Sequence, residues 1–142
     1  MLRTALCLAL ATLAAAADWT VGWKTAADAA AKAKKPILAD FTGSDWCGWC
    51  IKLKQEVFNT PEFAAWAKNK VVLLEVDFPR KTKLAGTQQQ ENDGLAEKYK
   101  IEGFPTILIL SPEGKELGRL GYEKGGPQVW TALADDILAG KR

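Results

Sequence analysis

Residues 37–50 read ILADFTGSDWCGWC, and most of the fold follows from this stretch. Its first five residues form a short apolar run around a single acid, Asp40, which is typical of a buried central strand. Beyond a turn over residues 42–45, apolar residues recur at helical spacing, at Trp46, Cys50, Leu53 and Val57. The stretch therefore predicts a strand, a turn and a helix, with Cys47 and Cys50 at the start of the helix.

The rest of the chain alternates predicted helices and strands. Helices are expected over residues 25–35 with Thr25 as the N-cap, from Pro61, and over residues 93–100 and 127–139. Strands are expected over residues 71–78, 106–110 and 116–121, and a long polar loop over residues 79–92. Strand–helix–strand units imply parallel pairing, whereas the last two strands form an antiparallel hairpin. We therefore expect an α/β domain, a mixed sheet with helices on both faces.

Composition excludes several classes of function. The chain has 142 residues, of which 48% are hydrophobic and 25% charged, enough for one packed domain. Its formal net charge of +2 is too small to indicate a nucleic-acid partner. The sequence contains no histidine, which rules out Cys–His and Ser–His–Asp catalysis and any His-ligated metal. We expect neither a metal nor a cofactor, and the chain shows no dimerisation segment, so a monomer is expected.

The first 17 residues have the pattern of a signal peptide. Arg3 supplies a positive charge, residues 4–13 are apolar but shorter than the roughly 20 residues that span a bilayer, and residues 14–17 are all alanine. We expect cleavage near residue 17, which leaves a domain of residues 18–142 in the periplasm or outside the cell. The alternatives are an uncleaved anchor and a buried N-terminal helix. Cleavage would also remove Cys7, leaving two cysteines.

Those two cysteines, Cys47 and Cys50, form a Cys-x-x-Cys pair at the start of a helix. Two intervening residues allow the sulfurs to bond, and the helix N-terminus favours a thiolate. We expect Cys47, at the exposed end of the turn, to be the nucleophile and Cys50, which points inward, to be the resolving thiol. The alternatives are a structural disulfide, which would stabilise little over so short a loop, and half of a zinc site, for which the ligands are too few.

Three segments together resemble the thioredoxin superfamily: residues 37–41, residues 46–50, and Gly-Phe-Pro-Thr at residues 103–106 ahead of an apolar run. The chain looks most like the secreted bacterial thioredoxin-like proteins with an extended loop before the last helix–strand unit. The resemblance implies a thioredoxin fold with a redox-active cysteine pair.

The resemblance also implies roles for individual residues. Pro105 matches the proline that follows a cis peptide bond and faces the cysteines, so that Phe104 can offer its backbone to a substrate strand. The residues implied to contact substrate are Trp46, Gly48, Trp49, Phe104, Pro105 and Thr106. Asp40 matches the buried acid that takes a proton from the resolving thiol. The turn before Cys47 is one residue longer than in ordinary thioredoxins, and residues 71–74 lack the lysine that often accompanies this acid.

The predicted function is disulfide exchange with exported proteins, as a reductase or isomerase that receives electrons from a membrane or soluble thiol donor. The dipeptide Gly48-Trp49 lacks the histidine of strongly oxidising relatives, which favours the reducing direction; a disulfide-forming oxidant is the runner-up within the same fold. A binding or chaperone-like module with a static Cys47–Cys50 bridge is the alternative from another class. The basic segment at residues 78–83 either selects acidic partners or is a solvated loop, and the second is the commoner case.

Overall fold

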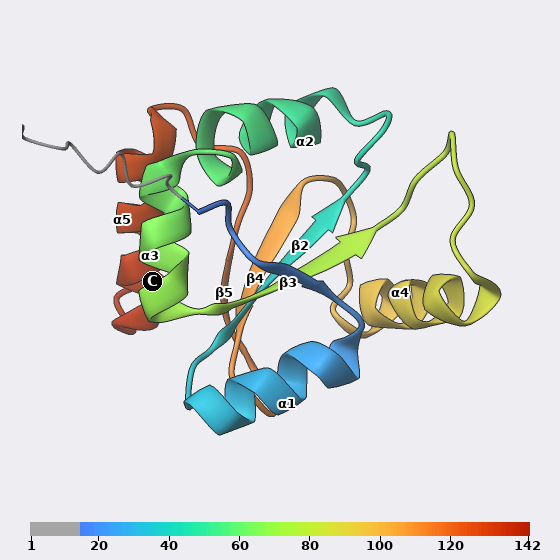
Figure 1. Ribbon diagram of the computed structural model, residues 1–142, viewed down its shortest axis with the longest axis horizontal. Coiled ribbons are helices and arrows are strands. Elements are labelled where there is room, and N and C mark those ends of the chain that lie inside the picture. The colour runs from blue at the N-terminus through green and yellow to red at the C-terminus, as the bar shows by residue number, and fades with distance from the viewer. Residues whose placement is uncertain (1–14) are drawn as a thin grey trace, which may run out of the picture.

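Five strands form one mixed sheet in the computed structural model, which describes residues 15–142 (Figure 1). The sheet has the order β1–β3–β2–β4–β5. The strands are β1 (Trp19–Val21), β2 (Ile37–Thr42), β3 (Val72–Asp77), β4 (Thr106–Leu110) and β5 (Glu116–Leu120). Both β1 and β2 run parallel to β3, whereas β4 is antiparallel to β2 and β5 is antiparallel to β4. The expected α/β fold with a mixed sheet and a terminal hairpin is confirmed.

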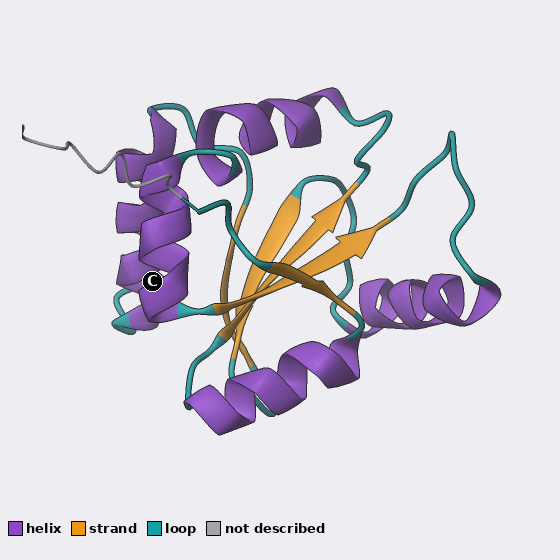
Figure 2. Ribbon diagram, in the orientation of Figure 1, coloured by secondary structure: helices purple, strands orange, loops and turns teal. Residues whose placement is uncertain are grey.

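Helices cover both faces of the sheet (Figure 2). They are α1 (Trp23–Ala33), α2 (Gly48–Leu53), a π-helical turn η1 that continues α2 (Lys54–Phe58), α3 (Pro61–Lys70), α4 (Gly86–Lys98) and α5 (Gly126–Leu138). One buried cluster joins the sheet to α2, η1, α3 and α5, and a second joins it to α1 and α4. Thr60 caps α3 through its side chain with Pro61 in the first turn, as the sequence predicts.

Strand β2 lies at the centre of the sheet, and all six of its residues are buried. Alternate side chains of a strand point to opposite faces. Ile37, Ala39 and Phe41 belong to the cluster beneath α1 and α4, whereas Leu38 belongs to the cluster beneath α2. Asp40 shares the face of Leu38. The alternation therefore places the one acid of this strand on the side where α2 carries the cysteines.

The expected loop over residues 79–92 is wrong in its second half, because α4 begins at Gly86. Hydrophobic spacing does not reveal these turns, since polar side chains stabilise them. Gln88 donates hydrogen bonds to Glu91 and Asn92, and the buried Asn92 donates to the backbone oxygen of Asp77 at 2.8 Å. The helix is thus anchored to the end of β3 by an amide.

The strand–helix–strand pattern led us to expect β4 to run parallel to β3. Instead, β4 is antiparallel to β2, which itself runs parallel to β3. Thr106 at the start of β4 pairs with Phe41 near the end of β2, and Leu110 pairs with Ile37. The segment after α4 returns the chain to the end of the sheet at which β2 finishes, so β4 begins there. The bend at residues 103–105 consequently lies at the same end of the sheet as the turn between β2 and α2.

Two further differences lie near the start of the chain. Helix α1 begins at Trp23 rather than after Thr25; its N-cap is Gly22, and the Trp23 backbone N–H donates to Glu91 on α4. The three-residue strand β1 was not predicted. The proposed signal segment lies largely outside the described residues. Within them, no helix has the length and apolar character needed to cross a bilayer.

Candidate active site

The two cysteines close a disulfide across the first turn of α2. Cys47 is the N-cap residue, and its sulfur accepts a hydrogen bond from the Cys50 backbone N–H at 3.2 Å. The Cα atoms of the pair are 5.2 Å apart. Gly43, directly after β2, connects the strand to both: its carbonyl accepts from the Cys47 N–H at 2.9 Å, and its N–H donates to the Cys50 sulfur at 3.5 Å.

Both cysteines are nearly buried, with 7% of Cys47 and 4% of Cys50 exposed. The expectation that Cys47 is exposed is therefore wrong. Its sulfur accepts a hydrogen bond from the Cys50 N–H and so lies against the first turn of α2. The neighbouring Gly48 and Trp49 are exposed, and they leave the approach to the pair open from that side.

Trp46, the residue before Cys47, forms one flank of the site. Its ring N–H donates to the Phe78 backbone oxygen at 2.7 Å, and the ring meets Phe104 edge-on at 5.9 Å between centroids. The Arg80 guanidinium lies 3.5 Å from the centre of the same ring. A Cβ at Gly43 would lie 2.5 Å from the Trp46 ring, so this position of the longer turn requires glycine. Sequence reasoning did not single out Gly43.

Trp49, the residue before Cys50, forms a second flank, and 57% of it is exposed. Its ring packs on Tyr122 in the loop after β5, with 5.0 Å between centroids, and the Lys52 ammonium lies over both rings. The Tyr122 hydroxyl donates to Glu56 at 2.5 Å, and this bond raises the pKa of Tyr122. Tyr122 was missed because its contact with Trp49 spans more than 70 residues, and nothing local in the sequence signals it.

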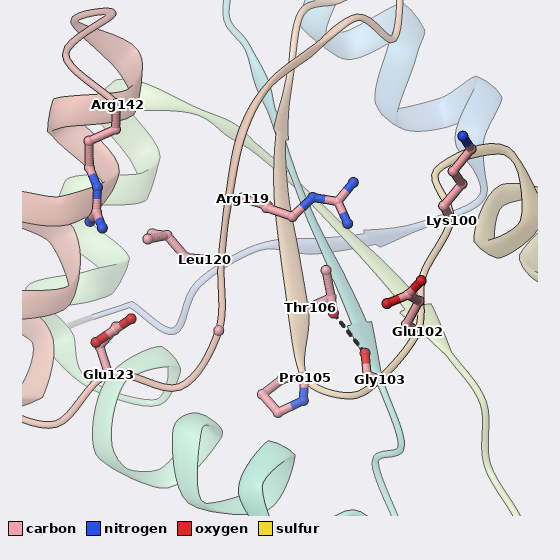
Figure 3. Close-up of a pocket in the computed structure, with 10 residues that line it drawn as sticks. Lys100, Glu102, Gly103, Pro105, Thr106, Arg119, Leu120, Glu123 and Arg142 are labelled. Atoms are coloured by element: carbon pink, nitrogen blue, oxygen red, sulfur yellow. Dashed lines mark hydrogen bonds between the residues drawn. The ribbon is translucent and has the colours of Figure 1, made fainter.

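The bend before β4 contacts the Trp46 flank through Phe104. The Phe104–Pro105 peptide bond is cis, the conformation that the resemblance implied. The Thr106 hydroxyl donates to the Gly103 carbonyl at 2.7 Å, which closes the bend (Figure 3). An open hollow of about 390 Å³ adjoins Pro105 and carries side chains of both charges, Lys100, Glu102, Arg119, Glu123 and Arg142 among them.

Asp40 lies beneath the cysteine pair. It lines a small cavity together with Cys50, and the cavity's volume of about 10 Å³ is close to that needed by one water molecule. One carboxylate oxygen, Oδ1, is buried without a hydrogen-bond partner among the described residues. Burial raises the pKa of Asp40 to about 8, and the charge of Glu75 adds to the rise. The longer turn thus leaves the acid on the side of Cys50.

Two charged residues share the cavity with Asp40. Glu75 is its neighbour on β3, paired with it in register, and burial also raises the pKa of Glu75. Lys54, one turn after Cys50, supplies the opposite charge and lowers the pKa of both acids. Strand β3 lacks the lysine that often accompanies this acid in thioredoxins. Lys54, in the π-helical turn η1, supplies a positive charge instead, and β3 carries the second acid, Glu75.

Comparisons with known proteins agree with this geometry. A family model described as a thioredoxin-like domain matches residues 23–135. The disulfide bond reductase DsbH of Chlamydia pneumoniae is 42% identical over 119 residues, which cover 82% of this chain and 72% of that protein. A solved structure of a DsbH oxidoreductase has a TM-score of 0.86 and 34% identity, covering 96% of this chain and 94% of its own.

The thioredoxin-related protein DsbJ of Chlamydia pneumoniae is 34% identical over 139 residues, which cover 93% of this chain. The match covers 39% of DsbJ, so the chain spans about two-fifths of that relative's length. The chain belongs to the thioredoxin-like family. With its Cys-x-x-Cys pair in place, it is a protein thiol–disulfide oxidoreductase.

Asp40→Asn is expected to stabilise the oxidised protein increasingly as the pH rises. The unfolded chain releases the Asp40 proton near pH 4, whereas the folded protein retains it until about pH 8. Unfolding of the wild type therefore releases a proton between these values, and the wild type loses up to about 1.4 kcal/mol per pH unit relative to the variant. Urea unfolding at about pH 5 and about pH 7.5 measures the difference. Thr42→Ser, a change at a buried non-titrating residue, sets the baseline; a pH-independent difference for Asp40→Asn would contradict the raised pKa.

Glu75→Gln and Lys54→Gln are expected to shift the pKa of Asp40 in opposite directions. Removing the Glu75 charge relieves repulsion of the ionised carboxylate and lowers this pKa, whereas removing the Lys54 charge raises it. Carbon NMR of the labelled Asp40 carboxyl follows both titrations. The Lys54 effect should weaken in salt because this side chain reaches solvent. Shifts of the same sign would show that these charges do not control Asp40.

Proposed function

We propose that this protein reduces disulfides of exported proteins, with Cys47 as the nucleophile and Cys50 as the resolving thiol. The observation that carries the proposal is the placement of the pair: the disulfide lies at the N-terminus of α2, Cys50 lines one cavity with the buried Asp40, and Trp46, the residue before Cys47, contacts the cis-proline bend. The name of the relative DsbH, a disulfide bond reductase, supports the reducing direction, as does the absence of histidine between the cysteines.

In the proposed reaction, the Cys47 thiolate attacks one sulfur of a substrate disulfide. That S–S bond breaks, a mixed disulfide forms, and the other substrate sulfur leaves as a thiolate that takes a proton. The Cys50 thiol then loses its proton and attacks the Cys47 sulfur, which releases the second substrate thiol and closes the Cys47–Cys50 bond. The substrate gains two electrons and two protons, and a donor dithiol must return the enzyme to its reduced form.

The helix N-terminus favours the first step. Unpaired backbone N–H groups and the helix dipole stabilise negative charge at the N-cap position, which Cys47 occupies. The Cys50 N–H already points at the Cys47 sulfur in the disulfide form. The same donor is placed to stabilise a Cys47 thiolate once the bond is reduced.

Asp40 is proposed to accept the Cys50 proton in the second step. A carboxyl with an ordinary pKa is a weak base toward a thiol whose pKa is about 8.5. Burial raises the pKa of Asp40 to about 8, close to that of the thiol, so proton transfer costs little free energy. Glu75 and Lys54 tune that value, and the cavity gives the proton a path of one water molecule or less.

The substrate segment is proposed to pair with the backbone of Phe104 at the cis-proline bend, as an added strand. Trp46 and Trp49 would flank the reacting sulfurs, with Gly48 leaving room between them and Pro105 and Thr106 completing the surface. We further propose that residues 1–17 direct export to the periplasm or beyond, that residues 18–142 form the working domain, and that it acts as a monomer supplied by a membrane or soluble thiol donor.

Cys50→Ser is expected to trap mixed disulfides between Cys47 and its substrates, because the resolving step is lost while the attack remains. Trapped species are recovered under non-reducing conditions and assigned by mass spectrometry, and insulin reduction should fall to background. Cys47→Ser is the matched control and should trap nothing. Substrate recovered only through Cys50 would reverse the assignment, and normal client binding without disulfide exchange would favour a static bridge.

A further inference from the structure

A cation lies over the ring of each flank tryptophan, Trp46 and Trp49. The Arg80 guanidinium stacks on Trp46, and the Lys52 ammonium lies 5.3 Å from the centre of the Trp49 ring. Cations over aromatic rings are held in place by the ring quadrupole. Positive charge is therefore held at both tryptophans that adjoin the cysteine pair in the sequence.

The basic loop at residues 78–83 is tied to the cysteine motif. Asp45, two residues before Cys47, accepts hydrogen bonds from the backbone N–H groups of Arg80 at 2.9 Å and Lys81 at 2.8 Å. Figure 1 shows this loop, between β3 and α4, beside the turn that joins β2 to α2. The bond from Arg80 is the largest cause of the lowered pKa of Asp45. The loop is thus positioned at the site, contrary to the commoner case of an independent solvated loop.

The charges of that loop are available to a partner. The side chains of Arg80, Lys81 and Lys83 are exposed, and none of the three is ion-paired with another side chain of residues 15–142. Asp45 directs its carboxylate at backbone N–H groups, and its attraction to the Lys81 charge leaves the three cations in excess over one carboxylate. A surface of this kind attracts carboxylates by steering them toward the site, an effect that salt screens.

The Trp49 flank also carries net positive charge, but less of it than the basic loop. Trp49 and Tyr122 line an open hollow of about 530 Å³, together with Lys52, Lys124 and Glu56. Glu56 accepts a hydrogen bond from the Tyr122 hydroxyl and lies 3.8 Å from Lys52, so this flank carries two cations, Lys52 and Lys124, against one carboxylate. The hollow beyond Pro105 differs, since both cations and carboxylates line it.

We infer that this oxidoreductase selects substrate segments whose cysteine is flanked by acidic residues. Carboxylates on one side of the substrate cysteine meet Arg80, Lys81 and Lys83, and those on the other side meet Lys52 and Lys124. The selection acts chiefly on the rate of encounter, because the cations are exposed and the chemistry at Cys47 is unchanged. This inference rests on the proposed disulfide exchange and names its substrate class.

Three peptides of one sequence test the inference. Each carries a single cysteine in a mixed disulfide with 2-mercaptoethanol, a small neutral thiol, and the cysteine is flanked on both sides by Asp, by Asn or by Lys. The fully reduced protein is mixed with each peptide, and the second-order rate constant is followed by tryptophan fluorescence and mass spectrometry. At low salt the Asp peptide should react on the order of tenfold faster than the Asn peptide, and the Lys peptide slower still. The contrast should shrink in salt of about 0.5 M.

Two triple variants locate the effect. Arg80→Gln, Lys81→Gln and Lys83→Gln together should lower the ratio of the Asp to the Asn rate constant toward one, leaving only the part that Lys52 and Lys124 contribute. The matched control removes the same charge at Lys32, Lys68 and Lys115, which lie near the opposite end of the central strands, and should retain the ratio.

The outcomes separate the inference from the function beneath it. Equal rate constants for the three peptides, a preference for the Lys peptide, or an unchanged ratio in the loop variant would overturn the charge selection and leave disulfide exchange standing. If none of the three peptides were reduced, both the proposed function and the inference would be overturned.

Discussion

The hydrogen bonds of Gly43 are the constraint on which the site depends. This residue ends the central strand, and its two backbone groups reach Cys47 and the sulfur of Cys50. Because β2 is buried on both faces, the position of its end is fixed by the whole sheet. The cysteine pair is consequently held at the end of the buried central strand, while α2 supplies the electrostatics of its N-terminus.

The same strand brings an acid beneath the disulfide, and the acid's environment is built from two elements. Asp40 loses solvation through burial and gains repulsion from Glu75 on β3, while Lys54 on the helix partly offsets both. A buried carboxyl whose pKa is raised to about 8 lowers the stability of the fold at neutral pH, because the unfolded chain can release the proton that the folded protein retains. The proposed use of Asp40 as a proton acceptor would account for a carboxyl at this position.

Local patterns in the sequence predicted the central strand, the cysteines at a helix start and the closing hairpin, because apolar spacing, capping residues and turn residues determine each of them. The first turns of α4 escaped prediction because amide side chains such as Asn92 stabilise them rather than apolar contacts. Tyr122 and Glu75 escaped because they reach the site through contacts between distant parts of the chain. Local sequence patterns were thus enough to single out the two cysteines. Glu75 and Tyr122 could not be predicted from such patterns, because they come from distant parts of the chain.

Cys47 and Cys50 are proposed to exchange electrons reversibly with other disulfides and to act as a reductant. The most direct measurement is the equilibrium reduction potential of the pair in a dithiothreitol or glutathione buffer. We expect a reversible two-electron transition nearer to thioredoxin's value of about −270 mV than to about −120 mV, the value of a strong disulfide donor. A value near about −120 mV would contradict the reducing direction, and a pair that does not equilibrate in either buffer would contradict the exchange reaction itself.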